Sequence, residues 1–254
     1  MKKFLVTMGL MAFAVVGCDD SSSASAGPND EPGIESSSSS SGKVTEPAEV
    51  TSSSSLKSES SSSVGDLLSS SSKGLELAEG SLTDTRDGQT YKTVTIGTQT
   101  WMAENLNYET ANSYCYNDNS ANCTKYGRLY TWGAAKTACP SGWHLPTSAE
   151  FETLFTAVGG SSTAGTKLKS TSAWNNSGNG TDAFGFSALP AGGRDGYEDY
   201  YYEGYYADFW SSTEDSTEDG SDCAYFMRLY YSYDYADLNN NYKFYGFSVR
   251  CLKD

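Results

Sequence analysis

The sequence predicts a mixed α+β domain that follows a signal peptide and a long serine-rich segment. Thr147 and Glu150 are spaced as a capping box in front of an apolar helix face at residues 151–155. Residues 91–96 and 99–102 alternate polar and apolar side chains on either side of a Gly-Thr turn, which predicts a β-hairpin. A helix and antiparallel strands within one segment indicate the α+β class.

Residues 1–17 have the pattern of a signal peptide. Lys2 and Lys3 precede an apolar run at 4–16, which is too short to span a bilayer as a helix. The run ends in Val-Val-Gly-Cys, which resembles the lipobox of bacterial lipoproteins and implies cleavage before Cys18 with a diacylglycerol on its sulfur. An ordinary secretory signal with a chance cysteine is the alternative.

Residues 18–80 are expected to be a disordered, lipid-anchored linker. Apolar residues are scarce there, so the segment cannot bury enough surface to offset its chain entropy. Its r.m.s. reach is roughly 45 Å, enough to hold a domain away from a membrane. A low-complexity insert without a role predicts the same disorder. The expected location is the cell envelope, with the outer membrane favoured and the cell surface as an open alternative within it; Asp19 and Asp20 do not decide which membrane holds the lipid.

The charge of the chain excludes two classes of partner. The formal net charge is -15, and residues 81–254 hold 21 Asp and Glu against 12 Lys and Arg, a difference of -9. Nucleic acids and anionic membrane surfaces both require a basic patch, and the sequence has none. The membrane is therefore expected to be met through the lipid alone.

Short predicted elements follow one another along residues 81–254. They are the hairpin, a polar loop at 109–125, an alternating segment at 127–132 with a helical turn at 134–135, the capped helix, a loop at 159–165, an ordered piece at 168–174, a buried strand at 184–189, a loop at 191–208, an acidic loop at 214–222, and strands at 224–233 and 242–252 around a turn at 239–241. In the last strand Phe247, Val249 and Cys251 share one face, opposite Ser248 and Arg250.

Six blocks of this segment resemble, in order, the Fibrobacter succinogenes major paralogous domain family. They read DGQTYKTVTIGTQTWMAENLNY (87–108), YGRLYTWGAA (126–135), CPSGWHLPTSAEF (139–151), GFSALPAGGR (185–194), FWSST (209–213) and GFSVRC (246–251). That family is similar to the C-type-lectin-like group, which includes formylglycine-generating enzymes. The resemblance implies a C-type-lectin-like domain at 81–254, with two short helices, small antiparallel sheets and long loops.

The cysteines fit an exported protein. The resemblance implies a disulfide between Cys139 and Cys251. By closing so long a loop, it would stabilise the fold by roughly 4–5 kcal/mol through the lower chain entropy of the unfolded state. Cys115 and Cys123 lie in one polar loop and can close a small ring. Cys223 is then left over, as a small buried apolar residue or, alternatively, as an intermolecular disulfide or reactive thiol.

No arrangement of residues predicts catalysis, so we expect a protein that is not an enzyme. His144 is the only histidine and is expected to be structural. A formylglycine-generating enzyme would need a late cysteine pair, but Cys251 is already assigned. Two less favoured interpretations of the acidic residues are a glycosidase-like site at Asp195, Glu198, Asp199 and Glu203, and a Ca²⁺ site at Asp215, Asp219 and Asp222; the spacing of the second does not match an EF-hand, and no cofactor is expected.

Tyrosines give the clearest indication of function. Thirteen of the 19 lie between residues 197 and 245, mixed with Gly, Asp, Asn and Ser, a composition typical of recognition surfaces. Packing in the core or across strands is the alternative, and it is favoured for Tyr225 and Tyr245. The residues predicted to contact a ligand are Tyr200, Tyr201, Tyr202, Tyr205, Tyr206, Tyr231, Tyr233, Tyr235 and Asn240.

The expected function is therefore a lectin-like binding module on a lipoprotein, for adhesion to polysaccharide or recognition of an envelope protein. A structural envelope protein that associates with copies of itself is the alternative.

Overall fold

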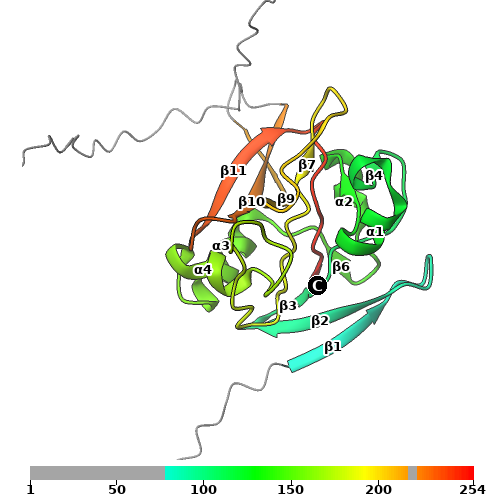
Figure 1. The fold of residues 1–254 in the computed structure, drawn as a ribbon. Coiled ribbons are helices and arrows are strands. Elements are labelled where there is room, and N and C mark those ends of the chain that lie inside the picture. The colour runs from blue at the N-terminus through cyan, green and yellow to red at the C-terminus, as the bar shows by residue number, and fades with distance from the viewer. Residues whose placement is uncertain (1–77, 217–221) are drawn as a thin grey trace, which may run out of the picture. The chain divides into compact units, whose positions relative to one another are not determined.

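The computed structural model describes residues 78–216 and 222–254, which belong to one compact unit of helices and antiparallel sheets (Figure 1). The predictions for the signal peptide at 1–17, for Cys18 and for the linker up to residue 77 lie outside the described residues. Within the described part, no helix is long and apolar enough to cross a membrane.

A five-stranded antiparallel sheet brings together the first and last strands of the described residues. Its order is β1 (Ala78–Thr83), β2 (Thr90–Ile96), β3 (Gln99–Met102), β12 (Leu252–Lys253) and β6 (Trp143–His144). The predicted hairpin is confirmed as β2 and β3, and Gly97 takes the left-handed backbone (φ 61°) that its two-residue turn requires. Strand β1 begins at Ala78, three residues before the predicted domain boundary.

The second sheet has three antiparallel strands with β10 at its centre. Its order is β11 (Ala236–Tyr242), β10 (Cys223–Tyr230) and β9 (Tyr206–Glu214). Two further pairs are β4 (Ser113–Tyr114) with β5 (Leu129–Tyr130), and β7 (Gly193–Arg194) with β8 (Tyr200–Tyr201).

The described residues contain four α-helices, where the resemblance implied two. They are α1 (Ser120–Tyr126), α2 (Trp132–Ala138), α3 (Ser148–Ala157) and α4 (Ser161–Leu168), and a 3₁₀ turn η1 (Tyr116–Asp118) precedes α1. The capping box of α3 is confirmed, because the Thr147 side chain accepts from the backbone N–H of Glu150 and the Glu150 carboxylate accepts from the backbone N–H of Thr147. Figure 1 shows α3 and α4 below β10 and β11.

The three-stranded sheet is buried on both faces. Phe209, Met227 and Leu229 face α3 and α4, whose Phe151 and Leu154 belong to the same core cluster. The opposite face carries Trp210 and Phe226 into a second cluster that contains Phe247, Val249 and Cys251. The predicted alternation from 247 to 251 is confirmed, but its other face is buried as well: Ser248 is 1% exposed and Arg250 is fully buried.

Several predicted elements were wrong because local sequence did not decide them. Most of the predicted loop at 159–165 belongs to α4, which runs from Ser161 to Leu168, since Ala164 and Leu168 pack into the core although the segment is otherwise polar. Residues 239–241 are paired within β11 rather than turned, because their register with β10 overrides the turn preference of asparagine. The expected strand at 184–189 forms only one bridge, between Ala188 and Lys169. The loops at 109–125 and 191–208 contain α1 and the β7–β8 pair.

Both expected disulfides are present. One joins Cys115 to Cys123 around η1 and α1, and the other joins Cys139, at the end of α2, to Cys251 beside β12. Cys223 is fully buried as expected, but it is also disulfide-bonded, so the expectation that it is left over is wrong. Counting cysteines along the chain does not reveal which of them the fold brings within bonding distance.

Candidate functional site

Six tyrosines form a continuous series of ring contacts at one end of the three-stranded sheet, which we call the tyrosine strip. Its members are Tyr201, Tyr202, Tyr206, Tyr230, Tyr233 and Tyr235. Neighbouring ring centroids lie 5.3 Å apart between Tyr201 and Tyr202, 4.5 Å between Tyr202 and Tyr206, 5.3 Å between Tyr206 and Tyr230, 5.2 Å between Tyr230 and Tyr233, and 4.8 Å between Tyr233 and Tyr235. Such spacings are those of favourable edge-to-face and offset-stacked pairs.

Strand pairing places these rings together. Tyr206 at the start of β9 pairs with Tyr230 at the end of β10, so both side chains lie on the same face of the sheet as Phe226. Tyr201 comes from β8, and the turn at 231–235 contributes the rings of Tyr233 and Tyr235.

The tyrosine strip is half-buried, with two exposed rings. Tyr202 is 53% exposed and Tyr233 is 47% exposed, while the other four are partly covered. Tyr201 packs against the second core cluster, and burial raises its pKa. Burial also raises the pKa of Tyr206 and of Tyr230. The rings are therefore held at one side and reach solvent at the other.

A buried ion pair lies next to these rings. Arg228 donates from Nε and Nη2 to the two carboxylate oxygens of Asp208, at 2.7 and 2.8 Å, and the Asp208 side chain is fully buried. Burial works against the charged form, but the Asp208 carboxylate outweighs it and raises the pKa of Arg228. The Arg228 guanidinium lies 4.8 Å from the Tyr206 ring centroid, within cation–π range. Burial raises the pKa of Asp237, which lies opposite Arg228 in the register of β11 against β10.

The structure brings together some of the predicted ligand residues and separates others. The rings of Tyr205 and Tyr231 contact each other at 5.1 Å, outside the strip. Tyr200 points elsewhere, since its hydroxyl donates to Asp118 and its ring contacts Tyr116. Asn240 donates to Asp215. The other five predicted tyrosines belong to the strip.

Sequence reasoning missed Tyr230 as a member of the strip. The signal was present, because Phe226, Arg228 and Tyr230 alternate along β10 and so share a face. Tyr245 contacts Phe247 of the core and Tyr201 of the strip, in line with the packing role favoured for it.

Two cavities are found among the described residues, and one of them lies beside the turn at 231–235. A pocket of about 380 Å³, which we call the amide pocket, is lined by Thr166, Lys169, Asn176, Ser177, Gly178, Asn179, Tyr231, Ser232 and Asp234. A polar cleft of about 680 Å³ lies between the β1–β2 pair, the end of α1 and the segments 170–172 and 182–189. Asn105 and Ser187 of the cleft accept hydrogen bonds from the buried Arg250.

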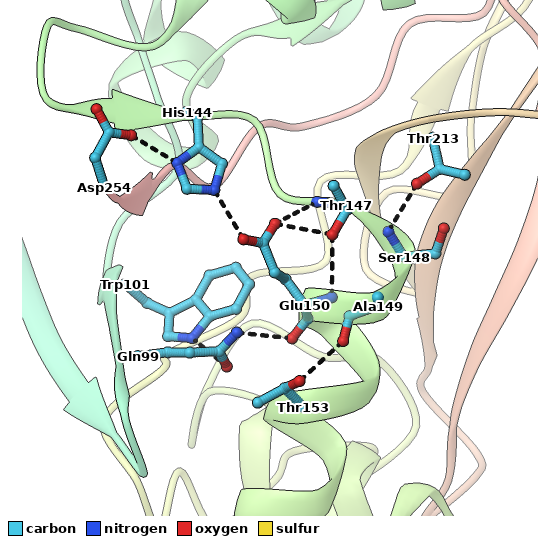
Figure 2. A network of polar contacts seen from close by, with 10 residues as sticks. All are labelled: Gln99, Trp101, His144, Thr147, Ser148, Ala149, Glu150, Thr153, Thr213 and Asp254. Carbon is cyan, nitrogen blue, oxygen red and sulfur yellow. Dashed lines mark hydrogen bonds and ion pairs between the residues drawn. The ribbon is translucent and has the colours of Figure 1, made fainter.

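His144 is held between two carboxylates, as Figure 2 shows. Its Nδ1 lies 2.7 Å from Asp254 Oδ1 and its Nε2 lies 3.0 Å from Glu150 Oε1, the carboxylate that also caps α3. Partial burial works against the imidazolium, but the hydrogen bonds to Asp254 and Glu150 raise the pKa of His144. The arrangement ties β6 to the start of α3, in agreement with the structural role predicted for this histidine.

Three of the four carboxylates in the acidic loop at 195–203 have partners. Asp195 accepts from the backbone N–H groups of Tyr197 and Asp199, which is turn geometry. Glu198 pairs with Arg194 at 3.4 Å and Glu203 with Lys125 at 3.7 Å. The less favoured Ca²⁺ interpretation includes Asp219, which lies outside the described residues, and the residues described hold no cluster of three or more metal-ligating side chains.

Comparison with known proteins gives one match. The model of the Fibrobacter succinogenes major domain family matches residues 94–253. No curated protein and no solved structure matches the chain.

Proposed function

The chain belongs to the Fibrobacter succinogenes major domain family, and we propose that it is a cell-envelope binding module that recognises polysaccharide through the tyrosine strip. The observation that carries this proposal is the strip itself. Tyrosine faces stack on the C–H face of a sugar ring, and half-buried rings lose little conformational entropy on binding. A row of such rings, with Tyr202 and Tyr233 exposed, suits an extended chain of sugars.

A lectin-like architecture for the domain is part of the same proposal. It is supported by the disulfide from Cys139 to Cys251, which links the segment before α3 to the last strand across 112 residues. We further propose that the protein is anchored in the envelope by lipid at Cys18, that residues 18–77 act as its tether, and that binding rather than catalysis is its activity.

Self-association is the second candidate, and it rests on exposed aromatic side chains. Phe244 is 51% exposed and stacks on Tyr242 at 5.1 Å, and Tyr197 is 89% exposed. Aromatic residues are enriched at interfaces between proteins. Sedimentation at increasing protein concentration would show oligomers if these residues meet a second copy.

A glycan array with the purified full-length protein in detergent tests the proposal. Tyr202→Ala and Tyr233→Ala should each weaken binding about tenfold, the equivalent of about 1.4 kcal/mol. Tyr197→Ala is the matched control, because Tyr197 is exposed but outside the strip. If no glycan binds, or if all three variants bind equally well, the proposal is wrong.

A further inference from the structure

We propose that the amide pocket is a specificity subsite that hydrogen-bonds the hydroxyl groups of one uncharged sugar unit, while the neighbouring units lie on the tyrosine strip. This inference rests on the proposed function and names the class of glycan: neutral rather than acidic.

The amide pocket and the tyrosine strip share one segment, the end of β10 and the turn that follows it. Residues 230, 233 and 235 give rings to the strip, whereas residues 231, 232 and 234 line the pocket. Lys169 fixes this turn from within the fold, since its ammonium donates to the backbone carbonyls of Tyr230, Tyr231 and Tyr233 at 2.9, 3.3 and 3.0 Å. The turn therefore presents the pocket lining on one side and strip rings on the other, and a glycan that contacts both crosses the edge of this turn.

The chemistry of the pocket suits hydroxyl groups. Its wall carries the amides of Asn176 and Asn179 and the hydroxyls of Ser177 and Ser232, all of which can donate and accept. Asn176 and Ser177 adopt left-handed backbone conformations, with φ of 51° and 62°, and both side chains are exposed. The Tyr231 ring adds an apolar surface, and a volume of about 380 Å³ lies in the range of small-ligand sites.

The charges near the strip disfavour an acidic glycan. Lys169 donates to three carbonyls and Arg228 pairs with Asp208. Arg194 pairs with Glu198 through Nη2, while its buried Nε has no hydrogen-bond partner. The carboxylates of Asp195, Asp199, Asp234 and Asp237 lie in the turns and strand around the same rings, and Asp199 and Asp234 are exposed. A polymer of uronic acids would meet like charges, whereas an uncharged one would not.

Titration calorimetry with the full-length protein tests this inference. The probes are neutral hexasaccharides of glucose, mannose and xylose, and a hexasaccharide of galacturonic acid. We expect at least one neutral probe to bind at least tenfold more tightly than the acidic probe, with little dependence on salt. The double variant Asn176→Gly with Ser232→Ala should weaken that binding about tenfold. Glycine accepts the left-handed backbone of Asn176, so the fold should be retained.

Asn112→Gly is the matched control, because Asn112 has the same kind of backbone (φ 59°) and lines neither the pocket nor the strip. Binding that is lost in Tyr202→Ala but unchanged in the double variant would overturn the subsite and leave the proposed function standing. Tighter binding of the acidic probe would overturn the neutral class. Absence of binding by every probe and by a wider glycan array would overturn the proposed function, and the subsite with it.

Discussion

Two buried cations lie beneath two hollowed surfaces of the described residues, and different sets of hydrogen-bond acceptors stabilise them. Arg250, fully buried, lies beneath the polar cleft, and Lys169, 2% exposed, lies beneath the turn at 231–235. Neither forms an ion pair with a carboxylate of the described residues. Burial lowers the pKa of both, to about 9 for Arg250.

The two cations differ in how much of the chain they connect. The Arg250 guanidinium donates to the side chain of Asn105 and to the carbonyls of Met102, Phe186 and Ser187, which joins two segments more than 80 residues apart. The Lys169 ammonium donates to three carbonyls of a single turn. The planar guanidinium of arginine has five donors and can reach several segments, whereas the compact ammonium of lysine suits acceptors that lie close together. Arg250 therefore connects distant segments of the core, whereas Lys169 stabilises a single turn at its edge.

Arg250→Met should have the largest effect on stability. It leaves three buried acceptors and one part-buried acceptor without this donor, so the free energy of unfolding should fall by roughly 3–5 kcal/mol. Thermal unfolding followed by circular dichroism would show Tm lower by roughly 10 °C. Arg250→Lys should recover only part of the loss, because an ammonium cannot reach both segments. A Tm for Arg250→Lys equal to that of the wild type would contradict the spanning role.

Lys169→Met should have a smaller and more local effect. Three carbonyls of the turn lose their donor, at a cost of roughly 2–3 kcal/mol in the free energy of unfolding. The near-ultraviolet circular dichroism of the tyrosines should weaken in the native state, because Tyr230 and Tyr233 of the strip share this turn. Lys167→Met, in the last turn of α4, keeps the carbonyl ring intact and is the matched control. An unchanged tyrosine signal in Lys169→Met would argue against this link.

The variant Asp208→Asn tests whether a carboxylate partner stabilises a buried cation more than a set of backbone carbonyls does. The variant leaves Arg228 buried without its counter-ion, and we expect a loss of about 2 kcal/mol in the free energy of unfolding. Glu198→Gln breaks the exposed pair with Arg194 and should change stability by about 0.5 kcal/mol or less. Urea denaturation of both variants measures the difference, and equal effects would mean that burial of the pair is unimportant.

His144 is a third cation for comparison, one that links β6 to the start of α3 near the surface. Its pKa is raised in the folded state, so its stabilising contribution is fully present below the unfolded value near 6.5 and is lost as pH rises through the folded value. Since the His144 side chain is 37% exposed, solvent screening limits the effect to roughly 0.5 kcal/mol. The difference in Tm between wild type and His144→Gln should therefore shrink from pH 6 to pH 8. A constant difference would show that the imidazole charge does not matter.

Local sequence was sufficient for elements whose stabilising groups are neighbours in the chain. The capping box of α3, the β2–β3 hairpin and the short ring from Cys115 to Cys123 were all predicted correctly, because each depends on residues within about ten positions of one another. The resemblance to the family was also readable from six short blocks. The disulfide from Cys139 to Cys251 came from that resemblance and not from local chemistry.

The candidate site was only half predicted. The cluster of tyrosines was visible in the composition, but the strip required the register of β9 against β10, which pairs Tyr206 with Tyr230. Tyr200 lies in β8 and is separated from the strip by its contacts with Asp118 and Tyr116. Neither Lys169 nor Arg250 was expected to be buried, because burial of a cation depends on carbonyls supplied by distant segments. Helix α4 likewise depends on packing partners far along the chain, and the asparagine-rich β11 on its pairing with the preceding strand β10.

The sequence by itself thus determined the capping box of α3, the β2–β3 hairpin, the short disulfide ring and the overall charge. Only the tertiary structure decided which rings meet and which cations are buried, because those outcomes depend on acceptors and strand partners that lie tens of residues away.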